Sequence, residues 1–180
     1  MTIEVEKRAL LDESRYHELL VLLDERAEDK GENDTVSVFY LREQSQIKVQ
    51  RNETARTAKI AWKSGGADGA EQRHELELPI GYDDFDAANE LMRAVVSDAQ
   101  VFPTKQTRHD YLIDDIDVAI KYSDDWGYHA ELEIVVDDGA RVEDALARIR
   151  ALADTLAIQL LSEDEERDFV AAHIAARGGR

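Results

Sequence analysis

The chain has 180 residues, of which 40 are acidic and 22 basic, giving a formal net charge of −18. This length suits one domain, the 43% hydrophobic content suffices for a sizeable core, and the acidity argues against a nucleic-acid-binding surface. The absence of cysteine excludes disulfides and thiolate metal sites. With no signal-peptide pattern and no apolar run long enough to cross a membrane, we expect a cytoplasmic protein without membrane partners.

In the first half, strands predominate. Alternating apolar and charged residues predict a strand at 3–11, and leucines at helical spacing after the cap candidates Asp12 and Ser14 predict a helix over 13–27. The polar segment 28–33 is expected to be a loop. A run rich in β-branched and aromatic residues predicts a strand at 35–42. Polar and apolar residues then alternate between turn signals, which predicts three more strands, at 46–51, 58–63 and 72–79.

The second half holds three more strands and three helices. Asp83 or Asp84 caps a helix over 85–97, and Pro103 is expected to break the chain after it. Strands follow at 105–112, 116–122 and 128–136, and helices at 142–160 and 163–177. We therefore expect a single domain over 1–180, with a strand-rich part over about 1–136 and a helical segment over about 140–178.

Several of these strands place charges of both signs on one face. The charged faces hold Glu4, Glu6, Arg8, Lys48, Lys59, Lys63, Arg73, Glu75, Glu77, Arg108, Lys121, Glu131 and Glu133. A half-solvated open sheet would explain this alternation. A closed barrel is favoured because the helices can cover its outside, and because an open sheet of eight strands would leave long edges to protect.

A barrel with these side chains inside needs a ligand, because unpaired buried charges are costly. Lysine and arginine bind phosphate oxygens, and arginine can do so in a bidentate manner. Carboxylates beside a phosphate imply Mg²⁺ or Mn²⁺ between the two. The pattern therefore indicates a metal-bound polyphosphate and the chemistry of phosphoryl transfer.

The ordered motifs resemble the CYTH superfamily, the triphosphate tunnel metalloenzymes, which includes class IV adenylyl cyclases, thiamine triphosphatases and inorganic triphosphatases. Glu4-Val5-Glu6-Lys7-Arg8 is similar to the family's N-terminal Glu-x-Glu-x-Lys, with Arg8 in the position of the lysine. The resemblance covers about residues 1–136. Its later blocks, in order, are Ile47–Gln50, Ala58–Gly65, Arg73–Glu77, Gln106–Arg108 and Trp126–Glu133.

The resemblance implies an α+β fold, an eight-stranded antiparallel β-barrel with helices packed outside it and C-terminal helices. It implies catalytic roles for Glu4, Glu6 and Arg8, and metal binding by Glu4, Glu6, Glu131 and Glu133, with Glu75 and Glu77 in support. The phosphate-binding candidates are Arg8, Lys48, Lys59, Lys63, Arg73, Arg108 and Lys121. The expected partner is a small triphosphate or polyphosphate.

Four residues depart from the family pattern. Arg8 replaces a lysine and is effectively never deprotonated, Gln50 and Gln106 replace basic residues, and Lys121 stands where many members have an aspartate. The expected activity is divalent-metal-dependent hydrolysis of an inorganic, nucleoside or other organic triphosphate. The alternatives are a class IV adenylyl cyclase and a non-catalytic polyphosphate- or nucleotide-binding protein, and the four departures motivate the latter.

Some remaining residues are expected to be structural. Trp62 is expected to pack under a helix, and Tyr111 and Tyr128 are expected to be packing residues. His74 and His109 have no partner spacing that indicates a zinc site. The C-terminal helices are expected either to cover a mouth of the tunnel or to form the contact of a homodimer.

Overall fold

The computed structural model describes residues 3–64 and 72–177, without the side chains of 72–74 and 173–177. Its strands are β1 (Ile3–Leu10), β2 (Glu28–Glu32), β3 (Thr35–Arg42), β4 (Ser45–Asn52), β5 (Thr57–Ser64), β6 (Gln72–Ile80), β7 (Gln100–Ile113), β8 (Ile116–Ser123) and β9 (Gly127–Val136). Its α-helices are α1 (Glu13–Arg26), α2 (Phe85–Val95), α3 (Val142–Thr155) and α4 (Glu163–Arg177).

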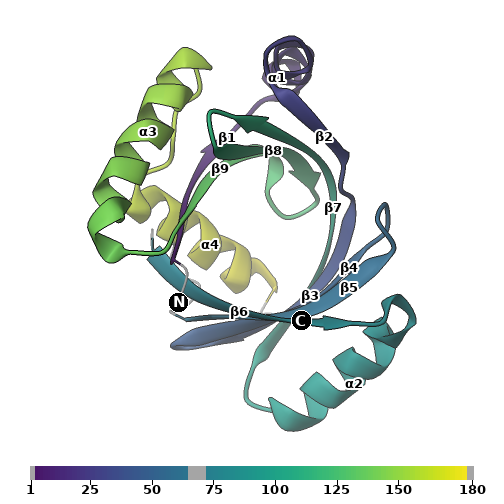
Figure 1. The fold of residues 1–180 in the computed structure, drawn as a ribbon. Coiled ribbons are helices and arrows are strands. Elements are labelled where there is room, and N and C mark those ends of the chain that lie inside the picture. The colour runs from purple at the N-terminus through teal and green to yellow at the C-terminus, as the bar shows by residue number, and fades with distance from the viewer. Residues whose placement is uncertain (1–2, 65–71, 178–180) are drawn as a thin grey trace.

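Eight of these strands close into an antiparallel barrel. The described sheet runs β2-β7-β3-β4-β5-β6-β1-β9-β8, and β8 pairs back onto β7 to complete the ring (Figure 1). Strand β2 lies outside the ring, paired to β7. Because side chains alternate between the two faces of a strand, closure turns one face of every barrel strand inward. The predicted eight-stranded barrel is confirmed.

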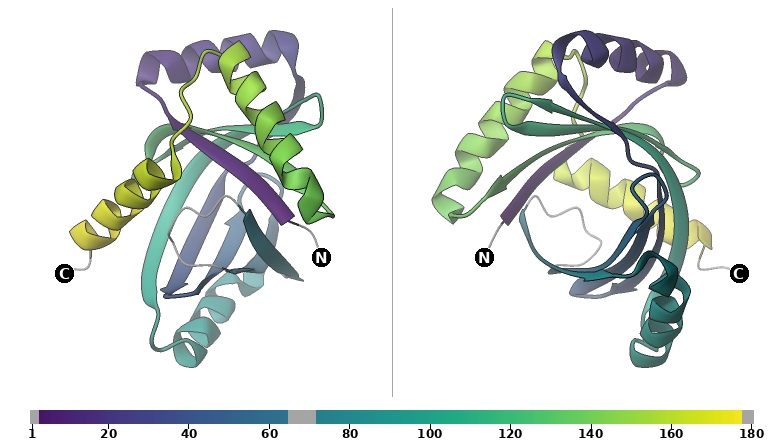
Figure 2. Two further views of the ribbon diagram at one scale, coloured as in Figure 1. Left: turned by 90° about the vertical axis from the view of Figure 1, so that its left-hand side faces the viewer. Right: turned by 45° about the vertical axis from the view of Figure 1, so that its right-hand side comes forward.

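Helices cover two outer regions of the barrel. Leu19 and Leu23 of α1 and Ile149 of α3 pack with the outer faces of β1, β8 and β9 in the larger core. Phe85 and Ala88 of α2 form a smaller core with β3 and β4, on the other side of the molecule (Figures 1 and 2). These helices leave the inward faces of the strands free to line a cavity.

Helix α4 lies at one end of the barrel rather than on its side (Figures 1 and 2). Phe169 of α4 packs on Trp126 with 4.5 Å between ring centroids, and Glu166 is buried. Of the two roles expected for the C-terminal segment, the fold places α4 over a mouth of the barrel. None of the described helices is long and apolar enough to cross a membrane.

Three predicted boundaries were wrong for identifiable reasons. The expected loop at 28–33 contains β2, whose pairing with β7 includes a bulge at Gly31, with φ of 87°. Strand β7 begins at Gln100, so Pro103 lies within it. Proline is tolerated there because β8 pairs with β7 only from Gln106 onward, which leaves an open edge before it. Helix α3 ends at Thr155, just before Ala157 adopts a positive φ of 49°.

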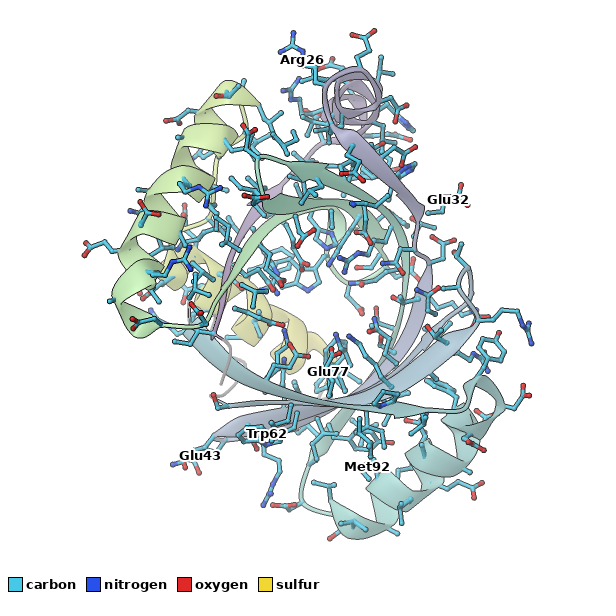
Figure 3. All side chains as sticks on the ribbon, viewed as in Figure 1. Arg26, Glu32, Glu43, Trp62, Glu77 and Met92 are labelled. Atoms are coloured by element: carbon cyan, nitrogen blue, oxygen red, sulfur yellow. The ribbon has the colours of Figure 1, made fainter. Side chains whose placement is uncertain are left out.

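The expectation for Trp62 was also wrong. Its side chain is on the outer face of β5, as the alternation predicted, but it is 36% exposed rather than packed under a helix (Figure 3). The reason is that α2 covers Val38, Tyr40 and Val49, on β3 and β4. Tyr111, in contrast, is buried as expected and donates a hydrogen bond to Asp24.

Candidate active site

The barrel encloses a cavity of about 930 Å³, lined by side chains from all eight of its strands and from α4. Figure 3 shows side chains projecting into the ring from the surrounding strands, with Glu77 inside the ring and Trp62 outside it. Twelve of the thirteen predicted site residues line this cavity: Glu4, Glu6, Arg8, Lys48, Lys59, Lys63, Glu75, Glu77, Arg108, Lys121, Glu131 and Glu133. The side chain of the thirteenth, Arg73, lies outside the described residues.

Three carboxylates converge where β1 meets β9. The register pairs Glu6 directly with Glu133, and ligand oxygens of Glu4, Glu6 and Glu133 all lie within 4.8 Å of one another. Like charges at this spacing destabilise a strand pair. Burial, together with the charges of Glu6 and Glu4, raises the pKa of Glu133 to about 8. Three convergent carboxylates are a donor set that fits a hard divalent cation.

The first of these carboxylates also faces the neighbouring strands β5 and β6. Burial acts to raise the pKa of Glu4, but a hydrogen bond with Glu75 and the charge of Lys63 outweigh burial and lower it. Glu4 is therefore held in its ionised form, which is the form that binds a cation.

Arg8 is surrounded by carboxylates. Its guanidinium forms ion pairs with Glu6 and Glu166 and donates from Nε to Glu131 at 2.8 Å, while its Cζ lies 5.2 Å from the ring centroid of Trp126. Burial acts to lower the pKa of Arg8, but these carboxylates outweigh burial and raise it. An arginine in this setting can hold an anion and cannot act as a base.

Most other cations of the cavity are also paired. The pairs join Lys63 to Glu4 and Glu75, Lys121 to Glu131, Lys59 to Glu77, and Arg108 to Asp110. Lys48 forms no ion pair with any residue that the structure describes, and burial together with the charges of Lys63 and Lys59 lowers its pKa to about 8. Lys48 is thus a cation available to an incoming anion without exchange of a protein partner.

Comparison with solved structures places this barrel among known folds. A conserved hypothetical protein from Pyrococcus furiosus matches over 93% of this chain and 98% of its own, with 18% identity and a TM-score of 0.76. A proposed adenylate cyclase from Vibrio parahaemolyticus matches over 87% and 90%, with 17% identity and a TM-score of 0.68. HpAC1 from Hippeastrum, which has a dominant triphosphatase activity, matches over 89% and 90%, with 16% identity and a TM-score of 0.59.

The chain has the CYTH fold. No family model and no curated protein matches the sequence. At identities below 20%, the likeness of this CYTH-fold chain to the solved structures concerns the fold, so the roles of its side chains have to be argued from the site itself.

The geometry divides the predicted metal ligands into two groups. Glu4, Glu6 and Glu133 come together, whereas Glu131 lies between Arg8 and Lys121. Burial acts to raise the pKa of Glu131, but Lys121 and Arg8 outweigh it and hold the pKa well below its usual value. Glu131 therefore positions two cations of the cavity.

Sequence reasoning missed several cavity residues. Glu166 lies 158 positions from Arg8 in the chain, so no strand periodicity could reveal their contact. His129 is 1% exposed, lines the cavity, and has its pKa lowered to about 4 by burial. Ser37 and Thr35 follow the inward alternation of β3, which is the signal in the sequence that could have identified them.

One further group of potential ligands lies outside the barrel. His109 accompanies Asp29 and Asp24, with ligand atoms all within 4.8 Å. His109 Nε2 is 2.7 Å from Asp29, its ring stacks on Tyr111 with 4.6 Å between centroids, and the Tyr111 hydroxyl donates to Asp24. These contacts satisfy the group internally and tie α1 and β2 to β7, so we assign His109 a structural role, as the sequence indicated.

Proposed function

We propose that this protein is a divalent-metal-dependent hydrolase that cleaves a triphosphate bound inside the barrel. The observation that carries the proposal is the juxtaposition of Glu4, Glu6 and Glu133 with several lysines and arginines in one cavity. The lysines and arginines can neutralise the negative charge of a phosphate chain. Carboxylates beside that chain would repel it unless a divalent metal ion lay between them.

Glu4, Glu6 and Glu133 would hold Mg²⁺ or Mn²⁺. The raised pKa of Glu133 supports this assignment, because a bound cation relieves the repulsion that keeps its proton in place. When bound, the cation supplies Lewis-acid polarisation of a phosphoryl oxygen and neutralises phosphate charge. Glu75 and Glu77 support the site by holding Lys63 and Lys59.

The basic side chains bind and orient the phosphates. Lys48 binds the phosphate chain of the ligand first, because it does not have to break an ion pair with any described carboxylate. Arg8, Lys63 and Lys121 exchange carboxylate contacts for phosphate oxygens, and their fixed positions neutralise the charge that develops in transfer. Arg8 moves no proton in this scheme; it positions the phosphate.

A phosphate-release assay tests the hydrolase. Purified protein is incubated with Mg²⁺ or Mn²⁺ and with inorganic triphosphate, ATP or thiamine triphosphate. We expect release that falls at least a hundredfold in Glu4→Gln/Glu6→Gln and is kept in a matched control, Glu25→Gln/Glu28→Gln, at exposed positions. Release from none of the substrates above the Glu4→Gln/Glu6→Gln background would overturn the hydrolase.

A second candidate function is binding without turnover. The observation that favours it is the saturation of Arg8 by three carboxylates at a position where the resembling family has a lysine. Calorimetry that gives tight triphosphate binding, together with no phosphate release, would decide for this candidate. Formation of cyclic AMP from ATP would instead decide for a cyclase.

A further inference from the structure

One wall of the cavity carries almost no charge. The registers of β3 with β4 and β7 arrange its inward side chains in rows of three neighbours. These rows are Asn52–Thr35–Gln106, Gln50–Ser37–Thr104 and Lys48–Phe39–Phe102. Lys48 binds phosphate in the proposed function, so we call the other eight residues the β3 wall; amides, hydroxyls and two aromatic rings make up all of it.

The β3 wall faces the carboxylates across the cavity. In the closed ring, three strands separate β3 from β1 in each direction, so these two strands lie on opposite sides of the barrel (Figure 1). A ligand whose phosphates lie against Glu4, Glu6 and their cations therefore extends towards β3.

Several polar groups of the β3 wall lack partners. Thr35 is 5% exposed, and its Oγ1 has no hydrogen-bond partner within the described part of the chain. Ser37 is 2% exposed and has no side-chain hydrogen bond to a described residue. Gln50 and Gln106 are half-buried, line the cavity, and likewise form no side-chain hydrogen bond to a described residue. Buried polar groups are normally satisfied, so the unpaired Thr35 Oγ1 points to a ligand that supplies the missing bond, and the two amides are available to the same ligand. Asn52, in contrast, is satisfied by Asn33 and by the Ala55 N–H.

The volume of the cavity leaves room for more than a bare triphosphate. The described lining has six basic residues, Arg8, Lys48, Lys59, Lys63, Arg108 and Lys121, and eight acidic ones, Glu4, Glu6, Glu75, Glu77, Asp125, Glu131, Glu133 and Glu166. Of these charged residues only Lys48 belongs to the rows on β3, β4 and β7, so an uncharged part of a ligand fits against the β3 wall. The volume of about 930 Å³ is near the upper end of the range of roughly 300–1,000 Å³ for sites of organic ligands.

We infer that the β3 wall binds a heteroaromatic group, and that the substrate class is therefore nucleoside triphosphates rather than inorganic triphosphate. Amides and hydroxyls offer the donors and acceptors that read the polar edge of a base, and Phe39 and Phe102 offer ring faces for stacking. Gln50 and Gln106 are the specificity-determining residues. The inference rests on the proposed function for the placement of the phosphates.

Equilibrium binding tests the inference without relying on turnover. Calorimetry in Mn²⁺ compares the β,γ-imido analogues of the four ribonucleoside triphosphates with inorganic diimidotriphosphate, all of which resist cleavage of the terminal phosphate. We expect at least one nucleotide analogue to bind tenfold or more tightly than diimidotriphosphate. Gln50→Ala/Gln106→Ala should reduce that ratio at least fivefold. The control Gln100→Ala, at an exposed position outside the cavity lining, should keep the ratio.

The outcomes separate this inference from the hydrolase. Equal or tighter binding of diimidotriphosphate overturns it, as does a double variant that weakens every analogue by the same factor. A nucleotide preference that depends on Gln50 and Gln106, but without phosphate release from the native nucleotide, supports the β3 wall and rejects the hydrolase. Phosphate release without a nucleotide preference supports the hydrolase and rejects nucleotide binding by the β3 wall.

Discussion

At the residue scale, Glu133 holds a proton in the folded protein at neutral pH. Its pKa is raised to about 8 by burial and by Glu6 and Glu4, whereas an ordinary glutamate in the unfolded chain has a pKa near 4.5. Between these values the folded protein holds a proton that the unfolded chain releases. The contribution of Glu133 to stability is therefore greatest at low pH and is lost as pH rises through about 5 to 8.

Removing this proton should be visible in the stability of the metal-free protein. We expect the free energy of unfolding, measured by urea denaturation, to decrease between pH 6 and 8.5 by an amount on the order of a few kcal/mol. Glu133→Gln should flatten the decrease, and Mn²⁺ should reverse it in the native protein only. An unchanged slope in Glu133→Gln would show that other groups cause the decrease; Glu143→Gln, at an exposed position, is the control.

Lys48 gives a second prediction at this scale, because it is a cation of the cavity without an ion pair to a described residue. A hydrogen bond to a charged group is worth about 1.5–3 kcal/mol, so Lys48→Met should weaken binding of diimidotriphosphate by roughly tenfold or more in calorimetry. Burial and neighbouring lysines lower the pKa of Lys48 to about 8, so the wild-type affinity should also fall above pH 8 as its charge is lost. An affinity equal to that of Lys105→Met, at an exposed position of β7, would contradict this role.

At the element scale, α4 is the least predictable part of the site. Its start is local: Ser162 and Glu165 exchange backbone and side-chain hydrogen bonds in a capping box. Its position is not local, because it depends on Glu166 reaching Arg8 and on Phe169 packing against Trp126. The helix was therefore predicted from the sequence and a place over a mouth of the barrel was one of two expectations for it, while the residues that make the contact were not predicted.

Breaking that contact should loosen α4 without unfolding the barrel. Arg8 keeps Glu6 and Glu131 as partners, so Glu166→Gln should cost about 1–3 kcal/mol. For a chain of this size that corresponds to a decrease in Tm of roughly 2–12 °C by differential scanning calorimetry. Asp168→Asn, at an exposed position of the same helix, should leave Tm unchanged. Equal Tm values for the two variants would show that Glu166 does not anchor the helix.

At the scale of the whole molecule, the two-residue period of the strands was enough to predict which charged side chains point into the barrel. Once Glu4 and Glu6 are on a strand they share a face, and the same holds for Glu131 and Glu133, so the inward sets followed from the sequence. Which members meet depends on register and closure. The pairing of Glu6 with Glu133 sets Glu133 beside the β1 carboxylates, and Glu131 opposite Arg8. Those pairings join segments more than 120 residues apart, which local periodicity cannot specify.

The central claim is that Glu4, Glu6 and Glu133 hold the metal that serves a triphosphate inside the barrel. A crystal structure with Mn²⁺ and the imido analogue that binds most tightly, with anomalous diffraction to locate manganese, tests it most directly. We predict anomalous density among these three carboxylates, with phosphate density beside it on Lys48 and Arg8. Manganese located only elsewhere, or an analogue bound outside the barrel, would contradict the account.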